Sequence, residues 1–304
     1  MERDQHRDGP VSLNRTLLVT HRGCLDGTGS ALMYLWAGGS RDLVLFRNPS
    51  GLQLSGDDVP GPVEEVWYVD CCPQDLSDPA AGRPFWVFDH HVSSQRVHGR
   101  DPRCEFDMGE CGTSLMANRL ALRNLDDDTE AFIGGMRDYD LGRFENPVGR
   151  RLADLAATYT QEQFLDVLLE HEAGIINDPA MAARAAGAEA VRSVYAERAA
   201  RAAVQSEIWL PEPTGRIVAA AAACPQDWKN DTANRILDTR PLVDVAVILD
   251  LMGGMVSLRS RPNGIDCSVI AGLYGGGGHA KAAGFRMPGG IDATLRGLIG
   301  GAFG

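Results

Sequence analysis

Three short apolar runs in the N-terminal half of the chain each stop at a histidine or an aspartate. Each run has the length and composition of a strand buried on both faces, which is typical of a parallel sheet. The runs and the polar residues that follow them are residues 16–20 with His21, residues 66–69 with Asp70, and residues 85–88 with Asp89, His90 and His91. Because parallel strands bring their carboxyl ends to one edge of a sheet, we expect these side chains to form one site.

Helical patterns separate several of these strands, and the alternation predicts an α/β fold. At 304 residues the chain is longer than one typical domain. The sequence becomes alanine-rich and charged near residue 150, and strand patterns return near residue 211. We therefore expect a disordered tail (1–12), a parallel-sheet domain (13–178), a helical connector (179–210) and a smaller α/β domain (211–304). In that second domain we expect strands at 216–222, 243–249 and 254–258, and a helix at 267–273.

The composition restricts the partners that the chain can bind. A formal net charge of −12 opposes long duplex nucleic acid, because such binding depends on neutralising phosphates. The charge does not exclude a short single-stranded substrate held at a local basic pocket. The polar first ten residues lack the apolar core of a signal peptide, and no stretch approaches the ~20 apolar residues that span a bilayer. We expect a cytoplasmic protein with reduced thiols, since the seven cysteines are odd in number and two are adjacent.

The turn after the first strand adds two side chains to His21 that can bind a metal. His21, Cys24 and Asp26 lie within six residues, and Gly27 lets the backbone approach the site closely. Imidazole and carboxylate at neighbouring strand ends suit manganese, magnesium, iron or zinc. A buried histidine beside an inert cysteine is the structural alternative for this motif taken alone.

A further apolar run, residues 132–137, leads to Asp138. Asp140 lies two residues later, and the sequence leaves open which of the two carboxylates joins the site. An acidic stretch at 126–130 suits the start of a helix here, because negative charge is favoured at helix N-termini.

Near the C-terminus a run of four glycines precedes His279. Its backbone N–H groups are expected at a helix N-terminus or an anion-binding nest, where a phosphate can bind. Arg259 and Ser260 end a predicted strand twenty residues earlier, and a guanidinium can hold a phosphate by two hydrogen bonds. The structural alternative for the glycine run is a flexible loop, and the structural alternative for Arg259 is an exposed salt bridge. The predicted phosphate-binding residues are Arg259, Ser260, Gly276, Gly277, Gly278 and His279.

Taken in order, these motifs resemble those of the DHH superfamily of phosphoesterases. The resemblance rests on His21 with Asp26, on Asp70, on the Asp-His-His of residues 89–91 and on the Arg-Asp-Tyr-Asp of residues 137–140. Residues 257–260, together with the Gly-Gly-Gly-His and Ala-Ala-Gly of residues 276–284, resemble the type-1 DHH-associated C-terminal domain. The likeness extends over nearly the whole chain, from about residue 13 to residue 287.

The resemblance implies two divalent metal ions, with manganese the expected metal, in a cleft between the domains. It assigns the first metal to His21, Cys24 and Asp70, and the second to Asp26, Asp70, His90 and Asp138. His91 would face the substrate phosphate, and Asp89 would orient a histidine. Relatives usually carry an aspartate at the position of Cys24. Because a thiolate is a softer ligand, zinc or iron is an alternative at the first site.

The function implied is hydrolysis of phosphate esters by metal-activated hydroxide. Small nucleotides or short single-stranded oligonucleotides are the expected substrates, since the chain is acidic and lacks the extra domains of a processive enzyme. A single-strand exonuclease is one alternative, and a non-catalytic nucleotide-binding module with a degraded first metal site is another. Residues 276–279 argue against an inorganic pyrophosphatase. The sequence leaves a homodimer open.

Overall fold

The computed structural model describes residues 13–122, 125–211, 215–225 and 228–287. The predicted tail, residues 1–12, lies outside this part. The chain divides into two compact units, Met1–Ala186 and Gly187–Gly304. Among the described residues, no helix combines the length and the apolar character needed to cross a bilayer.

The first unit is built on a parallel sheet, as the sequence predicts. Its strands lie in the order β2-β1-β3-β4-β5, and every neighbouring pair is parallel. The strands are β1 (Thr16–His21), β2 (Val44–Arg47), β3 (Glu65–Val69), β4 (Phe85–Asp89) and β5 (Cys104–Phe106). The sequence does not predict β5, because it has only three residues and none of them is buried.

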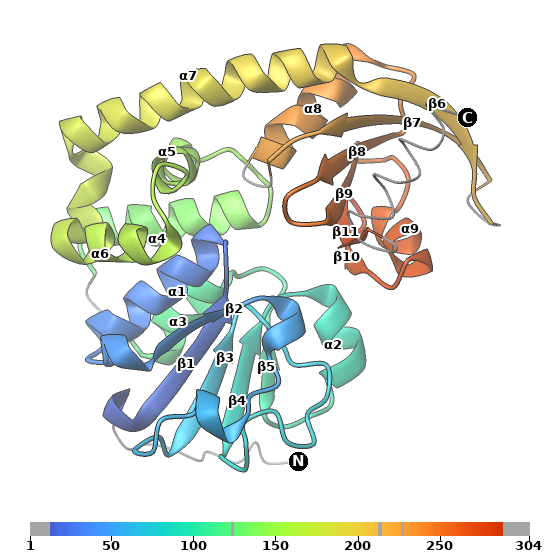
Figure 1. The fold of residues 1–304 in the computed structure, drawn as a ribbon. Helices are drawn as coiled ribbons and strands as arrows, with labels where there is room; N and C mark the ends of the chain where they lie inside the picture. The colour runs from blue at the N-terminus through green and yellow to red at the C-terminus, as the bar shows by residue number, and fades with distance from the viewer. Residues whose placement is uncertain (1–12, 123–124, 212–214, 226–227, 288–304) are drawn as a thin grey trace. The chain divides into compact units, whose positions relative to one another are not determined.

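Helices and loops cover opposite faces of this sheet. Apolar side chains of β1, β3 and β4, among them Leu18, Trp67 and Phe88, form one core with residues of the helices. Figure 1 shows the sheet and the helices beside it. Alternate side chains, such as Leu17 and Tyr68, pack against the irregular segments between β2 and β4. The helices are α1 (Leu25–Trp36), α2 (Val92–His98), α3 (Gly112–Arg119), α4 (Asp127–Asp140), α5 (Pro147–Ala156) and α6 (Gln161–His171). Helix α2 contributes no buried residue to this core.

The second unit is a mixed sheet in the order β10-β11-β9-β8-β7-β6. Only β7 and β8 are parallel to each other. The elements are β6 (Val204–Trp209), β7 (Arg216–Ala223), α8 (Lys229–Thr239), β8 (Val245–Asp250), β9 (Met255–Ser260), α9 (Cys267–Leu273), β10 (Gly277–His279) and β11 (Ala282–Arg286). Helix α8 packs on one face of the sheet and α9 on the other. Strands β7 to β9 and helix α9 agree with the sequence prediction.

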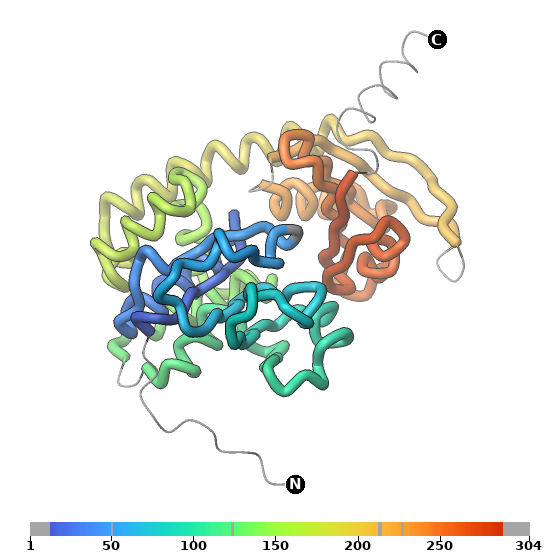
Figure 2. Tube along the Cα trace, turned by 60° about the horizontal axis from the view of Figure 1, so that its bottom comes forward, coloured from blue at the N-terminus to red at the C-terminus, as the bar shows by residue number. Residues whose placement is uncertain are grey.

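The segment predicted to be a helical connector is only partly helical. Helix α7 (Pro179–Ala202) is followed directly by β6, an edge strand that runs antiparallel to β7 in both views (Figure 1, Figure 2). Every residue of β6 is exposed, so the strand has no buried apolar face to reveal it in the sequence. The domain boundaries drawn from composition stay a prediction.

The glycine run does not begin a helix. It follows the C-terminal end of α9 and continues into β10, which forms a hairpin with β11. Gly275 has φ of 72° and Gly278 has φ of 136°, values at which a side chain is strained. A Cβ atom on Gly276 would lie 2.1 Å from the carbonyl oxygen of Gly284. These glycines therefore allow two backbones to approach closely, and the expected helix N-terminus is wrong.

Candidate metal centre

The carboxyl ends of the three predicted strands lie side by side in the first unit. Thr20 of β1 pairs with Val69 of β3, and Val69 pairs with Phe88 of β4. His21, Asp70 and Asp89 are the last residues of these strands or the first residues after them. His90 and His91 follow at the start of α2. The prediction that the polar residues meet at one sheet edge is confirmed by this register.

Asp70 is at the centre of the group. Its Oδ1 atom lies 3.2 Å from His90 Nε2, and its Oδ2 atom lies 3.9 Å from His21 Nδ1. The side chain is buried, and Oδ2 has no hydrogen-bond partner in the part of the chain that the structure describes. Its backbone has φ of 58°, which aspartate tolerates better than most residues. A buried carboxylate oxygen without a hydrogen bond is what a cation-binding site requires.

Asp26 is held by the N-terminus of α3. Its carboxylate accepts hydrogen bonds from Gly112 N (2.5 Å), Thr113 N (2.8 Å) and Thr113 Oγ1 (2.7 Å). A Cβ atom at Gly112 would lie 2.7 Å from the Cβ of Asp70 and 2.8 Å from Asp26 Oδ2. Burial, and then the charge of Asp70, raise the pKa of Asp26. Gly112 thus lets α3 approach the two aspartates closely.

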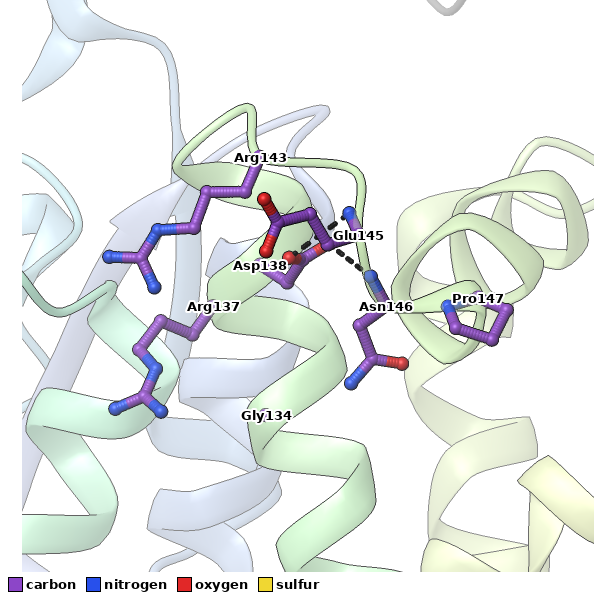
Figure 3. A pocket seen from close by; sticks show the side chains of 7 residues that line it. All are labelled: Gly134, Arg137, Asp138, Arg143, Glu145, Asn146 and Pro147. Atoms are coloured by element: carbon purple, nitrogen blue, oxygen red, sulfur yellow. Dashed lines mark hydrogen bonds between the residues drawn. The ribbon is translucent and has the colours of Figure 1, made fainter.

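Asp140, and not Asp138, joins the cluster. Asp140 Oδ2 lies 3.2 Å from His90 Nε2. Asp138 instead accepts hydrogen bonds from the backbone N–H groups of Glu145 (3.2 Å) and Asn146 (2.9 Å), as Figure 3 shows. Residues two apart on an α-helix point about 200° apart, so α4 cannot direct both carboxylates to one site. The structure therefore places Asp140 in the cluster, whereas the resemblance assigns Asp138 to the second metal.

Asp138 belongs to a different feature, an open hollow between α4 and α5 (Figure 3). The hollow is lined by Gly134, Arg137, Asp138, Arg143, Glu145, Asn146 and Pro147. None of the side chains clustered around Asp70 lines it, so the hollow and the candidate metal centre are separate features.

The two histidines are paired with carboxylates. His91 Nδ1 lies 2.7 Å from Asp89 Oδ1, which also accepts the backbone N–H of His90 at 2.8 Å. Burial alone would raise the pKa of Asp89, but the charges and hydrogen bonds of the two histidines lower it to about 2. Burial alone would lower both imidazole pKa values, but the neighbouring carboxylates raise the pKa of His91 to about 9 and that of His90 to about 10. The predicted role of Asp89 in orienting a histidine agrees with this geometry.

Cys24 ends the turn after β1 and is the N-cap of α1. Ligand atoms of His21, Cys24 and Asp70 all lie within 4.8 Å of one another, as do those of Asp26, His90 and Asp140. Burial, followed by the charge of Asp70, raises the pKa of the Cys24 thiol well above its usual value. A cation would favour the thiolate and offset the buried negative charge, so the donor set fits divalent metal ions.

The predicted phosphate-binding residues lie in the second unit. Arg259 donates from Nε (3.0 Å) and Nη2 (2.7 Å) to Asn230 Oδ1, at the start of α8. Arg259 pairs with Ala282, which pairs with His279, so Arg259 and His279 share a face of the sheet. Ser260 points to the other face, and its hydroxyl donates to the carbonyl oxygen of Ile265 at 2.7 Å. The structure therefore groups Arg259 with His279 and separates Ser260 from them.

Sequence reasoning missed two residues that position the site, Thr113 and Gln161. Thr113 holds Asp26, and Gln161 on α6 hydrogen-bonds to the turn at Cys24. Gln161 is 137 residues from Cys24 along the chain. A contact between segments so far apart leaves no local pattern in the sequence.

Comparison with known proteins gives one curated relative, and no family model matches the chain. The relative is the oligoribonuclease NrnB of Bacillus subtilis, 29% identical over 219 residues. The match covers 67% of this chain and 53% of the relative, so the chain spans about half the length of the curated protein that it matches.

Solved structures share the fold at low sequence identity. A pGpG-specific phosphodiesterase, PggH from Vibrio cholerae, is 13% identical with a TM-score of 0.52, over 93% of this chain and 96% of that one. RecJ from Thermus thermophilus in complex with Mn²⁺ is 17% identical with a TM-score of 0.53, over 91% of this chain and 50% of that one. At these identities the likeness establishes the fold alone.

Proposed function

We infer that this chain, a DHH-superfamily phosphoesterase by its motifs and fold, hydrolyses phosphate esters of small nucleotides or short single-stranded oligonucleotides. The observation that carries the proposal is the set of three overlapping ligand groups, two of which contain Asp70 and two of which contain His90. The Asp70 carboxylate has one oxygen near His21 and the other near His90. The curated relative is named as an oligoribonuclease, which supports a nucleotide substrate. A net charge of −12 also favours a short substrate over a long duplex.

The proposed metal ligands fall into two sets that share Asp70. The first set is His21, Cys24 and Asp70. The second is the group of Asp26, His90 and Asp140, to which we add Asp70 because its Oδ1 atom lies 3.2 Å from His90 Nε2. We expect manganese, with zinc or iron as alternatives at the first set because of the Cys24 thiol. Bound divalent ions supply two effects, polarisation of a phosphoryl oxygen and a lowered pKa for water.

The protein's own contribution to the reaction is to hold charge and orientation. His91 is protonated at neutral pH because its pKa is about 9, and the contact of its Nδ1 with Asp89 fixes the ring. A protonated imidazole can donate a hydrogen bond to a phosphoryl oxygen and stabilise the negative charge that develops there. Asp89 keeps His91 charged and oriented, so its replacement should lower kcat more than it raises KM.

The second unit is assigned the binding of a substrate phosphate. Arg259 and His279 share one face of the sheet, and Asn230 fixes the guanidinium of Arg259 by two hydrogen bonds. Arg259 Nη1 also donates to Leu258 O at 2.8 Å, and a guanidinium oriented in this way can hydrogen-bond to an anion. Gly277 and Gly278 form β10 together with His279, and their backbone amides lie in the same hairpin.

The experiment is hydrolysis of a substrate panel by the purified chain. The panel contains a dinucleotide, a short oligoribonucleotide, a cyclic dinucleotide, 3′-phosphoadenosine 5′-phosphate and pyrophosphate, each with manganese, magnesium, zinc or a chelator. We expect metal-dependent cleavage of one nucleotide class, which Asp70→Asn abolishes and Arg259→Ala weakens mainly through KM. No cleavage by a protein shown to hold metal would overturn the proposal and leave a nucleotide-binding module.

A further inference from the structure

The turn that carries two proposed metal ligands is held by a side chain from a distant helix. Gln161 is the first residue of α6. Its Nε2 atom donates to the carbonyl oxygens of His21 (3.0 Å) and Cys24 (3.1 Å) and to Thr28 Oγ1 (3.1 Å). Its Oε1 atom accepts the backbone N–H of Gly23 at 2.8 Å. A single amide group thus contacts both ends and the middle of the turn.

Other contacts also hold the turn. Arg22 donates from its backbone N–H to Arg47 O (2.8 Å) and from Nε to Phe46 O (3.2 Å), and Thr28 donates from N (3.3 Å) and Oγ1 (3.0 Å) to Cys24 O. Cys24 caps α1 without a side-chain hydrogen bond, and Gly23 has φ of 70°. The ion pair between Arg22 and Glu162 also joins the turn to α6 at 3.0 Å, but both side chains are nearly half exposed. Exposed ion pairs contribute little to structure. The Gln161 amide ties His21, Gly23 and Cys24 together, so it contributes to the positions of the His21 ring and the Cys24 thiol.

Helix α6 does not need the Gln161 side chain for its own N-terminus. Thr160 and Gln163 form the capping box, in which Thr160 Oγ1 accepts from Gln163 N at 3.2 Å and Gln163 Oε1 accepts from Thr160 N at 3.0 Å. The two glutamines therefore have different roles, because Gln163 stabilises the N-terminus of the helix and Gln161 holds the turn. Gln163 is exposed, so it offers a matched control on the same helix.

We propose that Gln161 is a positioning residue that sets the geometry of the first metal site through the backbone of residues 21–24. The proposal rests on the proposed function in one respect, the assignment of His21, Cys24 and Asp70 as a metal site. A carboxamide is suited to this task because it donates to two carbonyl oxygens and accepts from an N–H at the same time. A glutamate would keep the acceptor but place negative charge against those carbonyl oxygens. Residues that orient metal ligands typically change metal affinity about 10–100-fold when they are replaced.

The test compares Gln161→Ala and Gln161→Glu with Gln163→Ala and the wild-type protein. Cobalt(II) is titrated into metal-free protein, and thiolate-to-cobalt absorption in the near ultraviolet reports binding at Cys24. Cys24→Ser, which should remove the band, verifies its origin. Hydrogen exchange of the peptide that contains Gly23 is measured on the same metal-free samples.

Both Gln161 variants should weaken cobalt binding at the Cys24 site by roughly 10-fold or more, with faster exchange at Gly23. Gln163→Ala should leave both readouts near wild type, and the site formed by Asp26, His90 and Asp140 should keep its affinity in all variants. Cobalt affinity at Cys24 that is unchanged in Gln161→Ala would overturn the inference, as would a wild-type protein without the thiolate band. Hydrolysis of the nucleotide panel by the wild-type protein is a separate result, so either proposal can fail alone.

Discussion

Replacing Asp140 and Asp138 by asparagine, one at a time, should change the stability of the metal-free protein in opposite directions. The two residues are two positions apart on α4, and asparagine is nearly the same size as aspartate. Asp140→Asn removes a carboxyl group whose pKa is raised to about 8, first by burial and then by the charge of Asp26. Asp138→Asn removes a buried carboxylate that accepts two backbone hydrogen bonds.

The effect at Asp140 follows from proton linkage. Its pKa is about 8 in the folded protein against a reference value of 3.8. Below pH 3.8 this carboxyl group is protonated in both the folded and the unfolded chain, so its raised pKa costs no stability. Between pH 3.8 and pH 8 the group is ionised in the unfolded chain but still protonated in the folded protein, so the cost to folding grows as the pH rises. At ~1.36 kcal/mol per pH unit, this cost is on the order of 4 kcal/mol at pH 7. The loss of the contact with His90 offsets part of the gain, so Asp140→Asn should stabilise by about 1–3 kcal/mol.

The effect at Asp138 has the opposite sign. Asp138 is 8% exposed, and its oxygens accept from Glu145 N and Asn146 N. Asparagine presents an NH₂ group to one of these donors and leaves that donor without a partner. A hydrogen bond to a charged group contributes about 1.5–3 kcal/mol, and a buried unsatisfied group costs about 1–3 kcal/mol. Asp138→Asn should therefore destabilise the first unit by roughly 2 kcal/mol or more.

The assay is urea unfolding of chelator-treated protein, followed by circular dichroism at pH 7 and pH 5. The gain in Asp140→Asn should shrink at pH 5, as its linkage requires. Added manganese should stabilise wild type and Asp138→Asn by mass action, and Asp140→Asn much less. The reasoning is refuted if Asp140→Asn destabilises the metal-free protein as Asp138→Asn does. It is equally refuted if Asp138→Asn alone loses the response to manganese.

Three further predictions follow from the two sites. Manganese binding should release protons at pH 7 and tighten as the pH rises, because His90 has a pKa of about 10 and must be neutral to bind metal. Calorimetry in buffers of different ionisation enthalpy measures the number of protons released. Identical heats in all buffers would contradict the prediction. Cys24→Asp should shift preference from zinc towards manganese in competition titrations, and an unchanged order would exclude Cys24 as a ligand. Asn230→Ala should raise KM several-fold at similar kcat, which is also the result expected for Arg259→Ala. A fall in kcat at constant KM would reject the positioning of Arg259 by Asn230.

The sequence was sufficient to group residues that lie together in the structure where the local residue pattern and the overall fold agree. His21, Asp70 and His90 could be assigned to one site because each follows an apolar strand, and parallel strands end at a common edge. The sequence leaves open whether Asp138 or Asp140 joins the site, because the answer depends on the phase of a helix, which residue spacing at a helix end does not fix. The start of that helix is predicted by the acidic stretch at 126–130, where Asp126 accepts the backbone N–H of Thr129 and caps α4.

Other features were beyond the sequence because they depend on contacts between distant segments. Gln161 looks like any first-turn residue, and its importance comes only from the packing of α6 beside the turn at Cys24. The glycine run suggested a helix N-terminus, since glycine permits several backbone conformations that composition does not distinguish. Only the pairing of β10 with β11 fixes which of these conformations the run adopts.

The charges of the candidate metal centre also explain how it can remain folded without metal. Burial raises the pKa values of Asp26 and Asp140, while the carboxylates outweigh burial to raise those of His90 and His91. Each shift favours the protonated form, so the metal-free cluster retains protons that offset its buried negative charge. A divalent cation supplies the same compensation, and protons and metal therefore compete for one set of atoms. Acidic conditions should consequently release metal from this site before they unfold the sheet that carries it.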